Sequence, residues 1–196
     1  MLNKGFLIII SAPSGGGKTS ILKAIRSRIP SLEYSVSTTT RPPRRGERDG
    51  RDYYFINRDE FMKCVKDSGF TEWAQVHGHL YGTRDDFIRD KLDSGKSVLL
   101  DLDIQGALQI REKYPDAVLI FISPPSEEVL KKRLKKRGTD SDKQINMRIM
   151  KAEDEISKSG NYDYIVVNDV LKKAVGEVER IIEKEIECRS CKKSRH

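Results

Sequence analysis

The chain has 196 residues with a formal net charge of +7, and it is 37% hydrophobic and 34% charged. This length suits one compact α/β domain with smaller inserted lobes, and it is enough to bury a sizeable core. No apolar run approaches the roughly 20 residues of a membrane span, so we expect no membrane partner. Three cysteines are too few for a disulfide scaffold and favour a cytoplasmic protein. The positive charge suits nucleic acid and small anionic substrates equally well.

Continuous apolar runs predict the strands of a parallel sheet. The first run, residues 5–11 (GFLIIIS), is rich in Ile, and a glycine-rich turn and a helical spacing of apolar residues over 19–29 follow it. Further buried strands are predicted over 97–103, 117–123 and 164–168, and further helices over 106–113, 127–137, 142–159 and 170–187. Strands that alternate with helices predict an α/β fold with a parallel sheet flanked by helices.

Two segments interrupt this alternation. Residues 37–89 open with a stretch rich in Pro and Arg, continue with a short helix that a capping box of Asn57 and Glu60 begins, and include the strand-like FTEWAQV. We therefore expect an inserted lobe there, and the helix stop GTDS at 138–141 predicts a small mobile lid. The predicted organisation is core over 1–36, lobe over 37–89, core over 90–136, lid over 137–152, core over 153–187 and tail over 188–196.

The glycine-rich turn matches the P-loop pattern at every position except the first, where Ala stands for Gly. Its residues are Ala12, Pro13, Ser14, Gly15, Gly16, Gly17, Lys18 and Thr19. Glycines let backbone N–H groups surround a phosphate, while Lys18 neutralises β- and γ-phosphate oxygens and Thr19 offers its hydroxyl to Mg²⁺. The alternative is an ordinary glycine-rich turn. The strand before it and the helix after it favour a P-loop NTPase fold.

Two carboxylates end a predicted strand. A P-loop protein needs an acid at the end of a neighbouring strand to hold the water shell of the metal. Asp101 follows VLL at such a strand end, and Asp103 lies two residues on, on the same side of the strand. The alternative is a pair of strand-end carboxylates that only face solvent.

Arginines gather in two regions. Arg41 and Arg44 lie in a loop near Tyr53, and guanidinium forks with phenol hydroxyls suit the recognition of a second, non-transferred phosphate. Arg133 and Arg137 share one helix face, and Arg148 lies on the next helix, as in a cationic flap that stabilises a transferring phosphoryl group. For KKRLKKR, the alternative is a solvated helix face or a nucleic-acid patch. The P-loop upstream favours phosphoryl transfer with no nucleic-acid partner.

Seven motifs together resemble those of the guanylate kinase family over about residues 5–185. They are SAPSGGGKTS, SVSTTTRPPRRGERDGRDYYF, FTEWAQVHGHLYGT, LLDLDIQG, ISPPS, KKRGTDS and VVND, in family order and spacing. The resemblance implies a core with a parallel sheet, a GMP-binding lobe over 37–89 and a lid. It implies transfer of the γ-phosphoryl group of ATP to GMP or dGMP, with Mg²⁺ as the cofactor.

The same resemblance implies roles for individual residues. GMP is expected to contact Ser37, Glu72, Thr83 and Asp103 at the guanine, and Arg41, Arg44, Tyr53 and Tyr81 at the phosphate. ATP is expected to contact the loop from Ala12 to Thr19 with Arg133, Asn168 and Asp169. The implied catalytic residues are Lys18, Arg44, Arg137 and Arg148, and the implied metal ligands are Thr19 and, through water, Asp101.

Two rival functions remain open at this point. A binding module without catalysis would lack the loop lysine or the lid arginines, which this chain has. A kinase of the same architecture for another phosphorylated small molecule is disfavoured by the guanine contacts. The C-x-x-C at Cys188 and Cys191 lacks a second pair of ligands, and His77 and His79 lack a third, so we predict no metal role for them.

Overall fold

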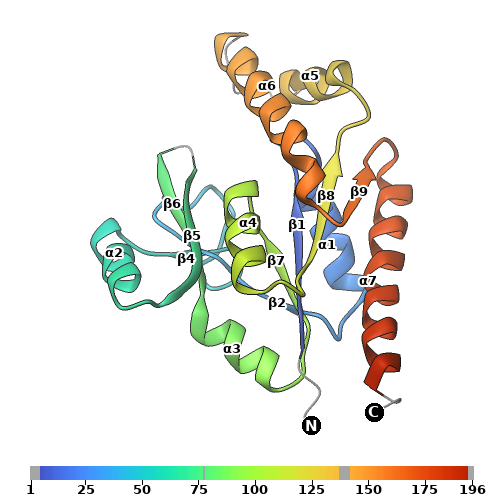
Figure 1. Cartoon of the computed structure of the whole chain (residues 1–196). Helices are drawn as coiled ribbons and strands as arrows, with labels where there is room; N and C mark the ends of the chain where they lie inside the picture. The colour runs from blue at the N-terminus through green and yellow to red at the C-terminus, as the bar shows by residue number, and fades with distance from the viewer. Residues whose placement is uncertain (1–4, 77, 137–141, 194–196) are drawn as a thin grey trace. The chain divides into compact units, whose positions relative to one another are not determined.

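The computed structural model describes residues 5–76, 78–136 and 142–193 (Figure 1). Within it the chain forms two compact units, and each is built from two separate segments. Unit 1 comprises residues 1–7 and 31–117, and unit 2 comprises residues 8–30 and 118–196. The segments predicted for core, lobe, lid and tail divide the chain differently from these two units, and they stay a prediction.

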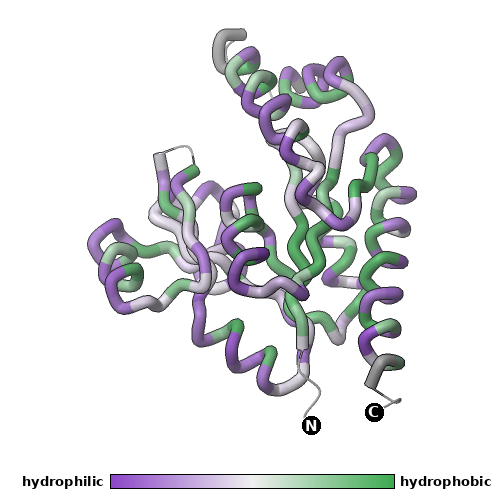
Figure 2. The backbone as a smooth tube through the Cα atoms, viewed as in Figure 1, coloured by the Kyte–Doolittle hydropathy of each residue, from purple (hydrophilic) through white to green (hydrophobic). Residues whose placement is uncertain are grey.

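Unit 2 is built around parallel strands. Strands β1 (Leu7–Ser11), β8 (Val118–Ser123) and β9 (Tyr164–Val167) pair in parallel, in the order β1-β8-β9. β1 and most of β8 are buried, because their runs of Ile, Leu, Val and Phe have helices to pack against (Figure 2). The strands predicted in this unit are confirmed, and so is the α/β fold class with parallel strands flanked by helices.

The helices of unit 2 follow the predicted order. They are α1 (Lys18–Arg28), α5 (Glu127–Lys136), α6 (Asp142–Ser157), the 3₁₀ turn η1 (Lys158–Asn161) and α7 (Leu171–Lys193). A salt bridge of 2.7 Å between Arg28 and Glu179 joins α1 to α7. The predicted end of the last helix at 187 is wrong, since α7 continues to Lys193. The residues after 187 are polar but include no Pro or Gly, so nothing stops the helix there.

Helices α5 and α6 share a small core of their own. Leu130 and Leu134 of α5 pack against Ile145, Ile149 and Ala152 of α6, and all five are buried. These apolar positions recur every three or four residues, which places them on one face of each helix. The helix stop predicted at 138–141 lies outside the described residues, between the end of α5 and the start of α6.

Unit 1 contains a parallel strand pair and an antiparallel-rich sheet. β2 (Glu33–Tyr34) pairs in parallel with β7 (Val98–Asp101). A second sheet has the order β4-β3-β6-β5, from β3 (Thr38–Thr39), β4 (Tyr54–Phe55), β5 (Phe70–Val76) and β6 (His79–Arg84). Its helices are α2 (Arg58–Lys66), α3 (Asp85–Asp93) and α4 (Ile104–Lys113). α3, β6 and the two-residue strands were not among the predicted elements.

The start of α2 confirms the predicted capping box. The side chain of Asn57 accepts from the Glu60 backbone N–H at 2.9 Å, and the Glu60 carboxylate accepts from the Asn57 N–H at 2.9 Å. Both bonds satisfy N–H groups that the first turn of a helix leaves without partners. No helix in the described part of the chain combines the length and the hydrophobicity that crossing a membrane requires.

The second sheet of unit 1 has two different faces. Phe70 and Leu80 pack with Phe61 of α2 on one face, and a Cβ added to Gly82 would lie 3.0 Å from the Phe70 ring on that same side. Because side chains alternate along a strand, Tyr81 and Thr83 point to the opposite face. The apolar face holds α2, so the other face is left for polar side chains.

Candidate functional site

The glycine-rich loop of unit 2 owes its shape to two glycines in the left-handed region. Gly15 has φ 88° and Gly17 has φ 95°, conformations that cost other residues free energy. Gly17 is the N-cap of α1, Lys18 is the first residue of that helix, and Thr19 is the second. Strand, loop and helix therefore follow as the P-loop pattern predicts, with the start of the helix, which has a positive potential, beside the loop.

Asn168 braces this loop from the end of β9. Its buried side-chain amide donates to the Gly16 carbonyl oxygen at 2.8 Å, and a Cβ on Gly17 would lie 2.2 Å from the same nitrogen. Gly17 is thus required by close packing as well as by its φ angle. The sequence places Asn168 and Asp169 together at this strand end, and the structure commits the Asn168 amide to the loop itself.

Arg133 of α5 joins this cluster. Its Nη2 donates to the Asn168 carbonyl oxygen at 2.8 Å, while Nη1 is buried and has no hydrogen-bond partner among the described residues. A buried cationic N–H group without an acceptor costs free energy, and a phosphate oxygen is an acceptor that would satisfy it. The Asn168–Arg133 pair beside the loop therefore suits an anion.

In unit 1, three predicted guanine contacts form one row across neighbouring strands. Glu72 of β5 is paired with Thr83 of β6, and the register Thr38↔Gly82 between β3 and β6, continued by one residue, sets Ser37 opposite Thr83. Residues directly opposite each other share a face of the sheet, and adjacent strands lie about 4.8 Å apart. The sheet thus brings two hydroxyls and a carboxylate together on the face away from α2.

Glu72 is buried and tightly held. It is 4% exposed, its Oε1 accepts from the Thr83 hydroxyl at 2.5 Å, and a Cβ on Gly106 would lie 2.6 Å from its Oε2. Gly106 therefore leaves room for the carboxylate at the start of α4. Asp103, the fourth predicted guanine contact, is the N-cap of that helix and accepts from the Gly106 N–H at 2.9 Å.

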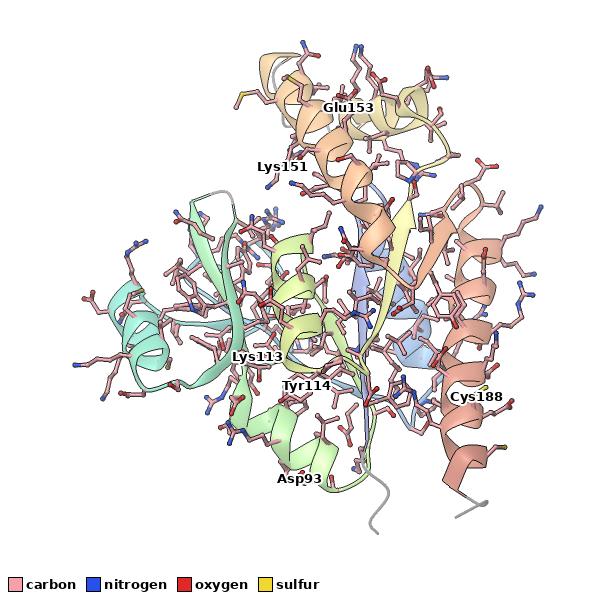
Figure 3. All side chains as sticks on the ribbon, in the orientation of Figure 1. Asp93, Lys113, Tyr114, Lys151, Glu153 and Cys188 are labelled. Carbon is pink, nitrogen blue, oxygen red and sulfur yellow. The ribbon has the colours of Figure 1, made fainter. Side chains whose placement is uncertain are left out.

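The surroundings of Glu72 disfavour its charged form. Burial, and to a smaller extent the nearby Asp103 carboxylate, raise the pKa of Glu72 to about 7, although the Thr83 hydroxyl and the charge of Lys113 act in the opposite direction. Lys113 (labelled in Figure 3) donates from its ammonium group to the Thr71 carbonyl oxygen, next to Glu72 in β5. A carboxylate with this pKa is poised to gain or lose charge near neutral pH.

The predicted phosphate ligands of unit 1 form a second cluster. The guanidinium carbon of Arg41 lies 5.3 Å from the centre of the Tyr53 ring, and the Tyr53 and Tyr81 rings meet edge to face at 6.0 Å. Arg41 is 8% exposed, whereas Arg44 is exposed on the loop that leads away from it. Three of the four predicted ligands are therefore in mutual contact.

The charge of Asp101 affects the pKa of Tyr53. Burial first, and then the negative charge of Asp101, raise the pKa of Tyr53 to about 12, so its hydroxyl keeps its proton and can donate. The half-buried Asp101 ends β7, as the sequence predicts, and its charge acts on the phosphate cluster of unit 1. Thr19, the other predicted metal ligand, is exposed in unit 2.

Of the two predicted lid arginines, one belongs to the described residues. Arg137 lies outside the described residues. Arg148 is half-buried on α6. The roles of both arginines stay predictions.

Sequence reasoning missed Glu47, Gly106 and Lys113. Glu47 contacts both loop arginines of unit 1, and Gly106 makes room for Glu72. For Glu47 a signal exists, because Arg-Arg-Gly-Glu is a turn sequence that folds the acid back onto the arginines. For Gly106 and Lys113 no local pattern reveals a partner about thirty or more residues away.

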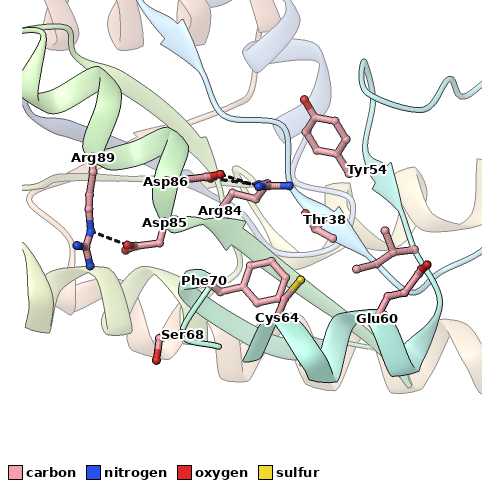
Figure 4. Close-up of a pocket in the computed structure, with 12 residues that line it drawn as sticks. Thr38, Tyr54, Glu60, Cys64, Ser68, Phe70, Arg84, Asp85, Asp86 and Arg89 are labelled. Carbon is pink, nitrogen blue, oxygen red and sulfur yellow. Dashed lines mark hydrogen bonds and ion pairs between the residues drawn. The ribbon is translucent and has the colours of Figure 1, made fainter. Parts of the chain in front are cut away.

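A separate pocket of about 520 Å³ lies in unit 1 between α2, the start of α3 and the second sheet (Figure 4). Its two arginines are already paired, Arg84 with Asp86 at 2.6 Å and Arg89 with Asp85 at 2.5 Å. None of the predicted site residues lines it, so we assign it no part in the chemistry.

The cysteines and the other candidate ligands give no metal cluster within the described residues. No group of three or more His, Cys, Asp or Glu side chains there could hold a metal ion. Cys188 (labelled in Figure 3) and Cys191 are exposed free thiols on α7, and Cys64 is a half-buried one in unit 1.

Comparison with known proteins identifies relatives over nearly the whole chain. The family model described as guanylate kinase matches residues 4–185. The guanylate kinase of Geobacter metallireducens is 50% identical over 182 residues, or 93% of this chain and 90% of that protein. That of Thermotoga maritima is 46% identical over 182 residues, or 93% of this chain and 88% of that protein. The crystal structure of guanylate kinase from Anaplasma phagocytophilum matches with a TM-score of 0.75 at 33% identity, covering 93% of this chain and 87% of that one.

Proposed function

Because this chain belongs to the guanylate kinase family, we propose that it transfers the γ-phosphoryl group of ATP to GMP, giving ADP and GDP. The observation that carries the choice of acceptor is the row of Ser37, Thr83 and Glu72 on one face of the second sheet. A buried carboxylate flanked by hydroxyls is a hydrogen-bonding pattern that a flat, polar ring with adjacent donors would complete.

The guanine edge matches this row in chemistry. Guanine presents its N1–H and N2–H₂ donors side by side, and the Glu72 carboxylate can accept from both. The O6 acceptor of guanine would take a hydroxyl hydrogen from Ser37 or Thr83. Adenine has an acceptor at N1 and a donor at N6, so AMP would set a ring lone pair against a buried carboxylate and leave that carboxylate without its donors.

We assign the phosphate group of GMP to Arg41, Arg44, Tyr53 and Tyr81. The contacts of Arg41 with the Tyr53 ring and of Tyr53 with Tyr81 support this assignment. The raised pKa of Tyr53 keeps its phenol a donor, which suits a phosphate that accepts only. We assign Asp103 to the guanine as well, and as the N-cap of α4 it also fixes the start of that helix, where Gly106 leaves room for Glu72.

We assign the phosphates of ATP to the loop from Ala12 to Thr19 with Arg133. Backbone N–H groups of the loop would surround the phosphates, and Lys18 would neutralise the β- and γ-oxygens. Arg44, Arg137 and Arg148 would stabilise the charge of the transferring group, because such transfers are catalysed mainly by positioning and electrostatics. Asn168 and Asp169 are assigned to the adenine end of ATP. The side chain and both backbone groups of Asn168 already bond within the protein, so Asp169 is the residue that remains for contact.

Mg²⁺ is the implied cofactor, and the oxygen donors present fit a hard cation. The residues assigned to it are Thr19, through its hydroxyl, and Asp101, through water, and it would supply positive charge that neutralises the phosphates. A cytoplasmic location and the absence of nucleic-acid and membrane partners stay predictions from composition.

The test is an assay of ADP release with GMP, AMP, CMP and UMP as acceptors. We expect turnover with GMP, and a kcat/KM for AMP lower by roughly 10⁴-fold. Equal rates with AMP and GMP would assign the chain another acceptor. Tight binding of GMP with no ADP release would identify a binding module instead of an enzyme.

A further inference from the structure

Glu47 connects the two loop arginines of unit 1. Both of its carboxylate oxygens accept from Arg41 Nη2 at 2.9 Å, and Oε2 also accepts from the backbone N–H of Arg44 at 2.7 Å. One half-buried carboxylate therefore holds the side chain of Arg41 and the main chain of Arg44.

A turn brings Glu47 back to these partners. The Glu47 N–H donates to the Arg44 carbonyl oxygen at 3.0 Å, and Gly46 between them has φ 89°. A type II turn needs a positive φ at its third residue, which glycine supplies without strain. Arg44 and Glu47 thus exchange a backbone bond and a side-chain bond, which closes the turn from both sides.

The Arg41 side chain is fixed on its remaining sides as well. Nη1 donates to the Pro42 carbonyl oxygen at 2.8 Å, and the guanidinium lies 5.3 Å and 5.8 Å from the centres of the Tyr53 and Phe55 rings. Glu47 adds an ion pair to these contacts of Arg41. Since a guanidinium has five N–H donors, these bonds still leave donors for a phosphate.

Coulomb's law alone predicts that Glu47 harms phosphate binding. A carboxylate beside an arginine cancels part of its charge and repels a dianionic phosphate. Against this, an arginine side chain loses rotamer freedom when it binds, and holding it in place beforehand removes that entropic cost. Glu47 also fixes the backbone of Arg44, an effect that the Coulomb interaction of Glu47 with the phosphate does not include. The two effects have opposite signs, so they can be separated by experiment.

We propose that Glu47 is a positioning residue that orders Arg41 and Arg44 to receive the phosphate group of the acceptor nucleotide. The proposal rests on GMP as the acceptor. It predicts that removing this negative charge weakens the binding of the anion. The binding free energy lost when the arginines are no longer held in place exceeds the binding free energy gained by removing the repulsion.

The experiment compares GMP with guanosine, which lacks the phosphate. For Glu47→Ala we expect the Kd of GMP, measured by titration calorimetry without ATP, to rise by about tenfold or more, and the Kd of guanosine to change by less than about twofold. In turnover, KM for GMP should rise and kcat should fall, since Arg44 moves too, while KM for ATP should stay within about twofold. Glu47→Gln keeps one acceptor oxygen and should fall between Ala and wild type.

Glu60→Ala is the matched control. Glu60 is an exposed carboxylate of the same unit that also holds a backbone N–H, that of Asn57, but contacts no predicted phosphate ligand. It removes the same charge and one equivalent bond, so it should leave the Kd of GMP near that of wild type. Thermal melts of both variants show whether either change merely unfolds the unit.

Three outcomes would overturn the proposal. Unchanged or tighter GMP binding in Glu47→Ala would show that positioning does not outweigh repulsion. Equal weakening of GMP and guanosine, or the same loss in Glu60→Ala, would reduce Glu47 to a structural role. If the wild type binds GMP but releases no ADP with it, the proposed activity fails, and the calorimetric comparison still decides the role of Glu47.

Discussion

The base site of unit 1, formed by Ser37, Glu72 and Thr83, and the phosphate loop of unit 2, residues 12–19, use different kinds of chemical group. At the base site the polar groups are side chains: Glu72 and Thr83 are 4% and 1% exposed and bond to each other. At the loop they are mainly backbone N–H groups, shaped by the positive φ angles of Gly15 and Gly17. One site is defined by residue chemistry and the other by backbone conformation.

This difference separates recognition of charge from recognition of a base. Backbone N–H groups and a lysine attract any phosphate, because every phosphate offers the same oxygen acceptors. A buried carboxylate accepts only from a partner with donors in the right places, and it is left without partners by any other. We therefore expect changes in unit 2 to affect rate or ATP use, and changes at the base site to affect the choice of acceptor.

The largest effect is expected at the loop lysine. Lys18→Ala removes the charge that meets the β- and γ-oxygens, so turnover should fall by several orders of magnitude with the fold intact. Lys23→Ala, an exposed lysine on the same helix, is the control and should leave turnover unchanged. If Lys18→Ala keeps more than about a tenth of the wild-type kcat, a loss of only ~1.4 kcal/mol, the loop is not the donor site.

The next effect tests the base site. Glu72→Gln keeps the shape but replaces one acceptor oxygen by a donor, so kcat/KM for GMP should fall by at least about 10²-fold, or ~2.7 kcal/mol. The GMP/AMP ratio should fall with it, because the site no longer matches two adjacent donors. Glu112→Gln, an exposed change on α4, should leave the ratio as it is. A ratio unchanged in Glu72→Gln would remove the base-reading role.

The two sites were also predictable to different degrees. The loop is contiguous in sequence, and strand, glycines and helix follow directly from local patterns, so Lys18 and Thr19 could be placed from residues alone. The base site joins Ser37, Glu72 and Thr83 from three strands. No local pattern states which strands pair, and these residues were predicted only through a family resemblance.

The strands that were not predicted lack a sequence pattern of their own. β6 (HLYGTR) carries only one strongly apolar residue on its packed face, because Gly82 there makes room for Phe70. β3 and β4 are two residues long and hold together through pairing, not through their own patterns. Glu47 was overlooked because a charged residue in a charged loop looks solvated until its turn is known.

A smaller effect is expected from the brace behind the loop. Asn168→Ala removes the bond to the Gly16 carbonyl oxygen and should let the loop relax, so KM for ATP should rise by about tenfold while KM for GMP stays near wild type. Asn161→Ala is the control, since its amide also donates to a backbone carbonyl, that of Lys158, at an exposed position. Equal effects on both substrates would show that Asn168 supports the unit as a whole.

The last effect is the pH dependence of guanosine binding. Burial raises the pKa of Glu72 to about 7, and guanine binding needs its ionised form. The Kd of guanosine should therefore fall as pH rises through 7 and level off above it, and it should be roughly tenfold higher at pH 6 than on that plateau. Stability has the opposite sign: the folded protein holds this proton more tightly than the unfolded chain, so the contribution is complete below pH 4.5 and is lost as pH rises to about 7.

Guanosine is the right probe because the second pKa of a phosphate is near 6, which would add its own pH dependence to GMP. In Glu72→Gln no proton is lost over this range, so the guanosine profile should be flat between pH 5.5 and 8. The loop of unit 2 supplies the internal comparison: ADP carries its own phosphate titration, so its binding should vary with pH in the same way in wild type and in Glu72→Gln, because Glu72 belongs to unit 1. A wild-type guanosine profile as flat as that of the variant would mean that Glu72 is already charged at pH 6 and that its burial does not control base binding.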